Sequence, residues 1–292
     1  MRLAAGAPAP ARAADCRPLS DGSAAVMRKD ARSARPENEE RYELTTPRPL
    51  IAGNWKMHGL SASLDEVRAI AAALDAQPAG ARVAICPPAT LIFRMAETLA
   101  GSGVAVGGQD CRPEREGAFT GCLSAEMLAD AGATMVILGH SEQRRYYDET
   151  SAQVAAKVGA ALRAGLEPIV CVGESAAERE AGREREVVLG QLADSLPDAL
   201  AGHAFAVAYE PVWAIGSGRT PSLAEIELVH GEIRAALCER WGQANGQAPI
   251  LYGGSVNGGN AAAILAANEV GGALVGGASL TATQFLPIVR AA

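Results

Sequence analysis

The chain has 292 residues, of which 49% are apolar and only 4% aromatic, and its formal net charge is −7. This length allows one large domain or two small ones, with a core built from Ala, Val, Leu and Ile. The negative charge argues against nucleic acid or an acidic membrane as a partner, although a local basic pocket stays possible. No apolar run reaches the roughly 18 residues of a membrane span, so we expect no membrane association.

The first 48 residues are rich in Ala, Arg, Pro and Ser and show no apolar periodicity. Such a segment buries too little apolar surface to offset the entropy of ordering it. We therefore expect a disordered N-terminal extension over residues 1–48 and a folded domain over 49–292. Two alternatives remain for the extension: a true start at Met27, or a targeting segment, because the stretch before Asp15 has arginines and no acids.

From Pro49 onward, short apolar runs alternate with segments of helical spacing. We expect strands at about 50–55, 82–86, 103–107, 134–138, 168–172, 205–209, 249–252 and 273–276. We expect helices at 62–76, 91–100, 124–131, 151–164, 178–196, 223–241 and 260–267, with further helices opening at His140 and after Gly277. This rhythm predicts an α/β fold, a single (β/α)8 TIM barrel. A doubly wound sheet would have fewer strands and usually a G-x-G-x-x-G turn, which this chain lacks.

Polar and glycine-rich groups follow five of the expected strands. Asn54 and Lys56 follow the first strand, His140 and Glu142 the fourth, and Glu210 the sixth. Gly253-Gly254-Ser255 follows the seventh strand and Gly276-Gly277 the eighth. Each group alone has an ordinary explanation, such as a solvated lysine, a structural histidine or a simple turn. Because all strand carboxyl ends meet at one rim of a barrel, together they predict an active site there.

The segment after the sixth strand has the layout of a hinged lid. Glu210 is followed by Pro211, which fixes φ, then by bulky apolar residues, and then by Gly216-Ser217-Gly218. A carboxylate under a lid that excludes water would become more basic, as proton abstraction from carbon requires. The alternative is an ordinary strand-to-helix loop with one solvated glutamate.

These motifs together resemble the triosephosphate isomerase family over residues 49–292. The resemblance is carried by Asn54–Met57, Gly139–Glu142, Tyr209–Thr220, Tyr252–Val256 and Ala273–Leu280. It implies a cytoplasmic, homodimeric barrel enzyme of glycolysis and gluconeogenesis. Such an enzyme interconverts dihydroxyacetone phosphate and D-glyceraldehyde 3-phosphate with no metal or organic cofactor. The six cysteines form no C-x-x-C pair and agree with reduced thiols in the cytoplasm.

The resemblance also implies roles for individual residues. Glu210 would be the base, with His140 as a neutral donor and Lys56 as a fixed positive charge. Asn54 would support them, and Glu142 would be the partner of Lys56. The positions that match the family's phosphate-binding residues are Gly216, Ser255, Gly276 and Gly277.

The loop from Gln109 to Ser124 resembles the arm through which the family forms its homodimer. Cys122 stands in this loop where most members have Glu, and Gln143 stands where most have Arg. Because both positions are neutral, we expect a pair of charges to have been lost together and replaced by a less polar contact.

Two other functions fit parts of the pattern. Another phosphate-binding barrel enzyme, such as an aldolase or a phosphoribosyl isomerase, would share the glycine-rich turns but lack the other motifs in this order. A catalytically inactive homologue used for binding would be free to lose Lys56, His140 or Glu210, and all three are present.

Overall fold

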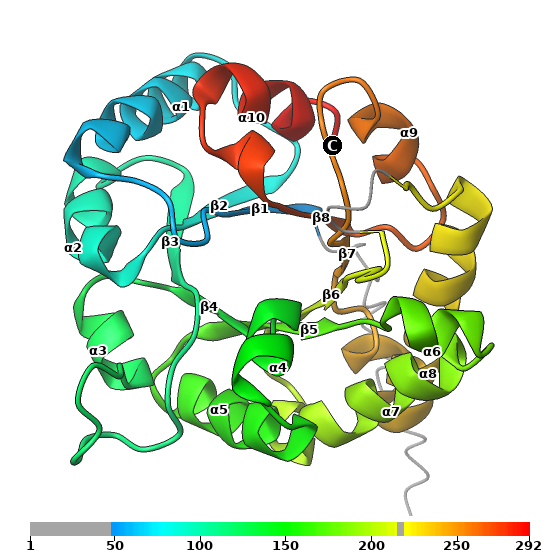
Figure 1. The fold of residues 1–292 in the computed structure, drawn as a ribbon. Coiled ribbons are helices and arrows are strands. Elements are labelled where there is room, and N and C mark those ends of the chain that lie inside the picture. Colours follow the sequence, from blue (N-terminus) through cyan, green and yellow to red (C-terminus); the bar gives the residue numbers. More distant parts are fainter. Residues whose placement is uncertain (1–47, 215–218) are drawn as a thin grey trace, which may run out of the picture. The chain divides into compact units, whose positions relative to one another are not determined.

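The computed structural model describes residues 48–214 and 219–292, and in them eight parallel strands close into a barrel (Figure 1). Each strand pairs with the next in chain order, and β8 pairs with β1. The strands are β1 Leu50–Asn54, β2 Arg82–Cys86, β3 Val104–Gly108, β4 Met135–Leu138, β5 Glu167–Val172, β6 Ala206–Tyr209, β7 Ile250–Tyr252 and β8 Gly272–Val275. The predicted (β/α)8 barrel is confirmed, with each strand end within two residues of its expected position.

Successive residues of each strand point alternately into the barrel and out toward the helices, as the period of a strand requires. Small or slender side chains such as Ala52, Ala84 and Ala208 belong to the interior cluster. Larger ones such as Ile51, Val83 and Tyr209 belong to the outer cluster that packs on the helices. Both faces of the sheet are therefore buried, which explains why the strands are continuous apolar runs.

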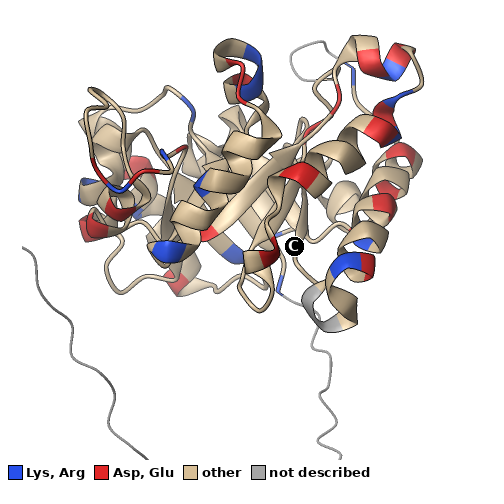
Figure 2. Ribbon diagram, turned by 90° about the horizontal axis from the view of Figure 1, so that it is seen from below, with Lys and Arg blue, Asp and Glu red and all other residues tan. Residues whose placement is uncertain are grey.

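The helices cover the outside of the barrel (Figure 1). They are α1 Leu64–Ala76, α2 Ala89–Thr98, α3 Ala125–Asp130, α4 Ser141–Tyr147, α5 Ser151–Arg163, α6 Ala176–Glu180, α7 Glu184–Ser195, α8 Leu223–Asn245, α9 Ala261–Leu265 and α10 Ala282–Val289, with 3-10 turns at Ser61–Ser63, Asp198–Leu200 and Gly277–Ser279. Figure 2 shows acidic and basic residues interspersed along these helices. Among the described residues, no helix is long and apolar enough to cross a membrane.

One helix expectation is wrong. The segment 178–196 is not a single helix, because α6 ends at Glu180 and α7 begins at Glu184. Gly182 lies between them with φ of +66°, a left-handed conformation that ends a helix. The helical spacing of the apolar residues on both sides concealed this break.

A fully buried histidine, His230, joins α8 to the barrel. Its Nδ1 lies 3.1 Å from the carbonyl oxygen of Glu269, and its ring packs edge-on against Tyr209. The other nitrogen, Nε2, is buried and has no hydrogen-bond partner among the described residues. Burial lowers the pKa of His230 to about 4, because a proton on Nε2 would place a charge where no acceptor meets it.

His230 therefore makes stability depend on pH. The unfolded chain binds a proton at this histidine below about pH 6.5, whereas the folded chain does so only near pH 4. The free energy of unfolding should fall across this window as pH falls, by about 3 kcal/mol in total. We expect the unfolding midpoint of His230→Gln to decline less than that of the native chain. His203→Gln, at an exposed site, serves as control. An equal decline in native chain and His230→Gln would contradict this account.

Candidate active site

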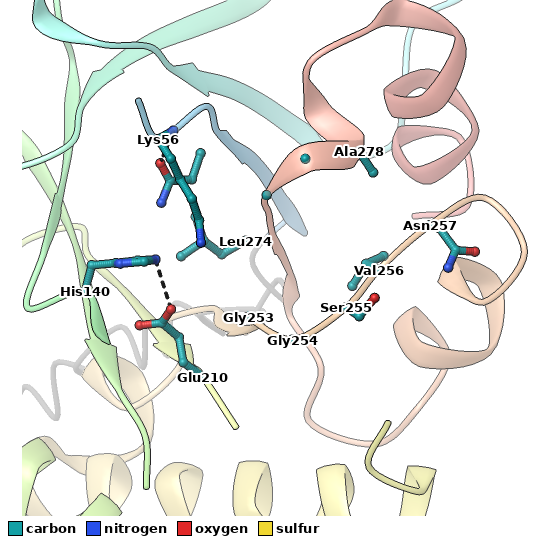
Figure 3. A pocket seen from close by; sticks show the side chains of 13 residues that line it. Lys56, His140, Glu210, Gly253, Gly254, Ser255, Val256, Asn257, Leu274 and Ala278 are labelled. Atoms are coloured by element: carbon teal, nitrogen blue, oxygen red, sulfur yellow. Dashed lines mark hydrogen bonds and ion pairs between the residues drawn. The ribbon is translucent and has the colours of Figure 1, made fainter. Parts of the chain in front are cut away.

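A pocket of about 390 Å³ lies at the carboxyl ends of the strands (Figure 3). It contains seven of the predicted site residues: Asn54, Lys56, His140, Glu210, Ser255, Gly276 and Gly277. Glu142 does not line the pocket but forms an ion pair with Lys56, which does. Gly216 lies outside the described residues. The pocket is also lined by Gly253 and Gly254, which belong to a predicted glycine-rich turn, and by Val256, Asn257, Leu274 and Ala278, to which no role had been assigned.

Lys56 follows β1, and hydrogen bonds to its backbone N–H and to its carbonyl hold it there. Its backbone N–H donates to Oδ1 of Asn54 at 3.0 Å, and its carbonyl accepts from Nε2 of Gln109 at 2.9 Å. These bonds stabilise a left-handed backbone with φ of +52°, which is unfavourable for a lysine. The ammonium group lies 2.8 Å from Oε1 of Glu142. Lys56 is thus a fixed positive charge directed into the pocket.

His140 immediately precedes α4 and is its N-cap, as expected. Its Nδ1 accepts the backbone N–H of Glu142 at 3.2 Å, so in the neutral ring the proton is on Nε2. Nε2 lies 3.0 Å from Oε1 of Glu210. Burial lowers the pKa of His140, but the charge and hydrogen bond of Glu210 outweigh it, so the pKa is raised. The Glu142 N–H thus supports the expected neutral ring, whereas Glu210 opposes it.

Glu210 is only 2% exposed, and three donors surround its carboxylate. Ser141 donates from its backbone N–H at 2.8 Å and from its hydroxyl at 3.0 Å, and His140 is the third donor. Burial raises the pKa of Glu210, but His140 and Ser141 together lower it below its ordinary value. In the position that Glu210 has here, the donors of His140 and Ser141 thus outweigh the burial that was expected to make this carboxylate a stronger base.

The opposite end of the pocket is formed by backbone. Ser255 lies there, across from His140 and Glu210 (Figure 3), and Gly276 and Gly277 line the same pocket. A Cβ added to Gly277 would meet no atom of the described residues within 4 Å, so packing against this part of the chain does not require a glycine at that position. The missing side chain instead leaves room for a ligand to approach the backbone.

A buried carboxylate, Glu174, supports the segment that follows Glu210. Its Oε1 accepts from the hydroxyl of Tyr209 at 3.1 Å, Nε1 of Trp213 at 2.8 Å and Nη1 of Arg179 at 3.1 Å. The guanidinium of Arg179 also stacks over the Trp213 ring at 4.4 Å. These contacts fix the beginning of the expected lid. The sequence did not identify Glu174 or Arg179, because neither lies in a recognised motif.

No group of His, Cys, Asp or Glu within 48–214 and 219–292 has an arrangement that could hold a metal ion. The chemistry available in the described pocket comes from a carboxylate, an imidazole, an ammonium group and backbone donors.

Comparisons with known proteins agree with this geometry. The family model described as triosephosphate isomerase matches residues 49–292. A triosephosphate isomerase of Caulobacter vibrioides is 60% identical over 247 residues, which are 85% of this chain and 98% of the relative. One of Ruegeria pomeroyi is 56% identical over 84% of this chain and 97% of the relative. The crystal structure of triosephosphate isomerase from Bartonella henselae has a TM-score of 0.78 at 44% identity, covering 84% of this chain and 98% of that one. The chain belongs to the triosephosphate isomerase family.

Proposed function

We propose that this chain is an isomerase that interconverts dihydroxyacetone phosphate and D-glyceraldehyde 3-phosphate through an enediolate, in glycolysis and gluconeogenesis. One observation carries the proposal: Glu210, His140 and Lys56 face one pocket whose far end is a glycine-lined backbone cradle. The reaction moves a carbonyl by one carbon, which requires a base for the proton, donors for the oxygens and a site for the phosphate. Each requirement has a matching group in the pocket.

Glu210 is the base that removes a proton from one carbon and returns it to the next. Its oxygens are occupied by Ser141 and His140, so it must leave them before it can accept a proton. Leaving removes the interactions that lower its pKa, whereas burial, which raises the pKa, remains. Movement of the side chain thereby turns a weak base into a stronger one.

The same movement prepares His140 and Lys56. Once Glu210 has left, Nε2–H of His140 is free to donate to an enediolate oxygen, and the charge that raises its pKa is further away. Lys56 supplies a positive charge held by Glu142, and Asn54 keeps the Lys56 backbone in place. Donors fixed before the reaction stabilise developing charge without reorganisation.

The phosphate occupies the cradle of Ser255, Gly276 and Gly277, where glycines allow close approach to backbone N–H groups. We assign Gly216 the fourth contact, which would couple phosphate binding to lid closure. No metal or organic cofactor takes part in this mechanism.

We further propose that the enzyme is a cytoplasmic homodimer formed through the loop Gln109–Ser124. Large apolar side chains are exposed in this loop and near it, with Met57 94%, Phe119 37% and Tyr147 74% exposed. Such a set of exposed apolar residues is typical of a protein interface. We also propose that the isomerase domain spans residues 49–292 and that residues 1–48 are an extension outside it. We propose no nucleic acid or membrane partner.

Glu210→Gln tests the base. We expect kcat with glyceraldehyde 3-phosphate to fall by about 10²–10⁴, because the amide cannot accept the proton. KM should change little, because the phosphate cradle is intact. Glu186→Gln removes an exposed carboxylate and should leave kcat unchanged. Retention of kcat in Glu210→Gln, measured in a coupled assay, would exclude this residue as the base.

Cys122→Glu and Gln143→Arg test the interface. Each single change should weaken the dimer by about tenfold or more, because it introduces a charge without its counter-charge. The double variant should recover much of the loss, as a double-mutant cycle of dissociation constants by analytical ultracentrifugation would show. Native dimerisation in both single variants would refute the proposed pairing.

A further inference from the structure

We propose that Arg144 is a positioning residue that sets the relative position of His140 and Glu210 by joining the ends of β4 and β5. The inference rests on the proposed function. Arg144 lies in the last turn of α4 and is partly buried, and it is not one of the residues that line the pocket.

The Arg144 side chain spans four elements. Its Nε donates to the carbonyl of Gly139 at 2.9 Å, and its Nη2 donates to the carbonyl of Cys171 at 3.2 Å. Nη2 also donates to Oγ of Ser195 at 3.0 Å, and Nη1 to Oγ of Ser151 at 3.1 Å. One guanidinium therefore links the end of β4 to β5, to the start of α5 and to the end of α7.

Both carbonyls lie next to residues that place the catalytic groups. Gly139 immediately precedes His140, whose own carbonyl accepts the backbone N–H of Arg144 at 3.1 Å. Cys171 immediately precedes Val172, whose carbonyl accepts the backbone N–H of Glu210 at 2.8 Å. Arg144 thus reaches the backbone one residue before His140 and one residue before the anchor of Glu210.

The hydrogen bonds of Arg144 lie just beyond the last paired residues of β4 and β5. The paired register of β4 and β5 stops at Leu138 opposite Val170. Gly139 and Cys171 are the next residues on each strand, so Arg144 joins the two chains just beyond the ladder. A planar group with several fixed donors suits this task, since it can bind two carbonyls at once.

Gly139 makes room for this contact. It has φ of +69°, and an added Cβ would lie 2.9 Å from Nη2 of Arg144 and 3.0 Å from Cγ2 of Val154. The residue before His140 is therefore shaped to receive the guanidinium.

The contacts of Arg144 are to neutral groups, and no ion pair of Arg144 is found in the described part of the chain. Burial lowers the pKa of Arg144, while the charges of Glu149 and Glu210 act in the opposite direction. The guanidinium is thus not held by a partner carboxylate.

The experiment compares the native chain with Arg144→Met and Arg144→Lys, using Arg290→Met as an exposed control. Four quantities are measured: kcat, KM for glyceraldehyde 3-phosphate, the inhibition constant of inorganic phosphate, and the unfolding midpoint. In Arg144→Met we expect kcat to fall about 10–100-fold, because small displacements of catalytic groups are costly. KM and phosphate inhibition should stay within about threefold of native, because the cradle lies at the other end of the pocket. Arg144→Lys should recover part of kcat.

An unchanged kcat in Arg144→Met would overturn the inference. The inference would also be overturned if KM and the phosphate inhibition constant rose by the same factor by which kcat falls. Such a result would indicate general damage to the pocket. If Arg144→Met does not fold, Ser195→Ala removes one Nη2 contact and keeps the charge. It should lower kcat a few-fold at native KM, and native kcat would overturn the inference. An inactive native chain would instead refute the proposed function, and this inference with it.

Discussion

The three hydrogen bonds that hold the Glu210 carboxylate against Ser141 and His140 determine how this site can work. They compensate the cost of burying a charge, and for that reason they also make the carboxylate a weak base. A carboxylate that is stabilised by these hydrogen bonds has too low a pKa to remove a proton from carbon efficiently. The free energy needed to release it must come from elsewhere, and the phosphate, bound far from the reacting carbon, is the available source.

The barrel makes this arrangement possible. Glu210 follows β6, His140 follows β4 and Lys56 follows β1, so no pair of them comes from adjacent strands. Closure of a parallel barrel brings all strand ends to one rim, and large side chains such as Leu50 and Ile169, together with alanines such as Ala208, fill its interior. Beyond the strand ends, where the backbone hydrogen bonds of the sheet stop, side chains bind the loops. Gln109 donates to the Lys56 carbonyl, and Glu174 accepts from Trp213.

Much of this architecture could be predicted from the sequence, because buried parallel strands are continuous apolar runs and chemical groups follow them directly. The break at Gly182 could not, since the helical spacing continues on both sides of it. Side-chain contacts between different helices and strands could not be predicted from the sequence either. Nothing in the sequence indicates that Ser141 binds Glu210, although it lies inside a recognised motif. The protonation of His140 shows the same limit: its place before α4 was predictable, but the nearness of Glu210, which raises its pKa, was not.

The central claim is that Glu210 rests as a weak base and becomes a stronger one when a ligand fills the pocket. The most direct test is a ¹³C NMR titration of the Glu210 carboxyl, assigned by comparison with Glu210→Gln. The titration is made in the free protein and with a phosphorylated carboxylate that mimics the enediolate. We predict a pKa below the ordinary range in the free protein and a clear rise with the ligand bound. The same low pKa in both states would contradict the account.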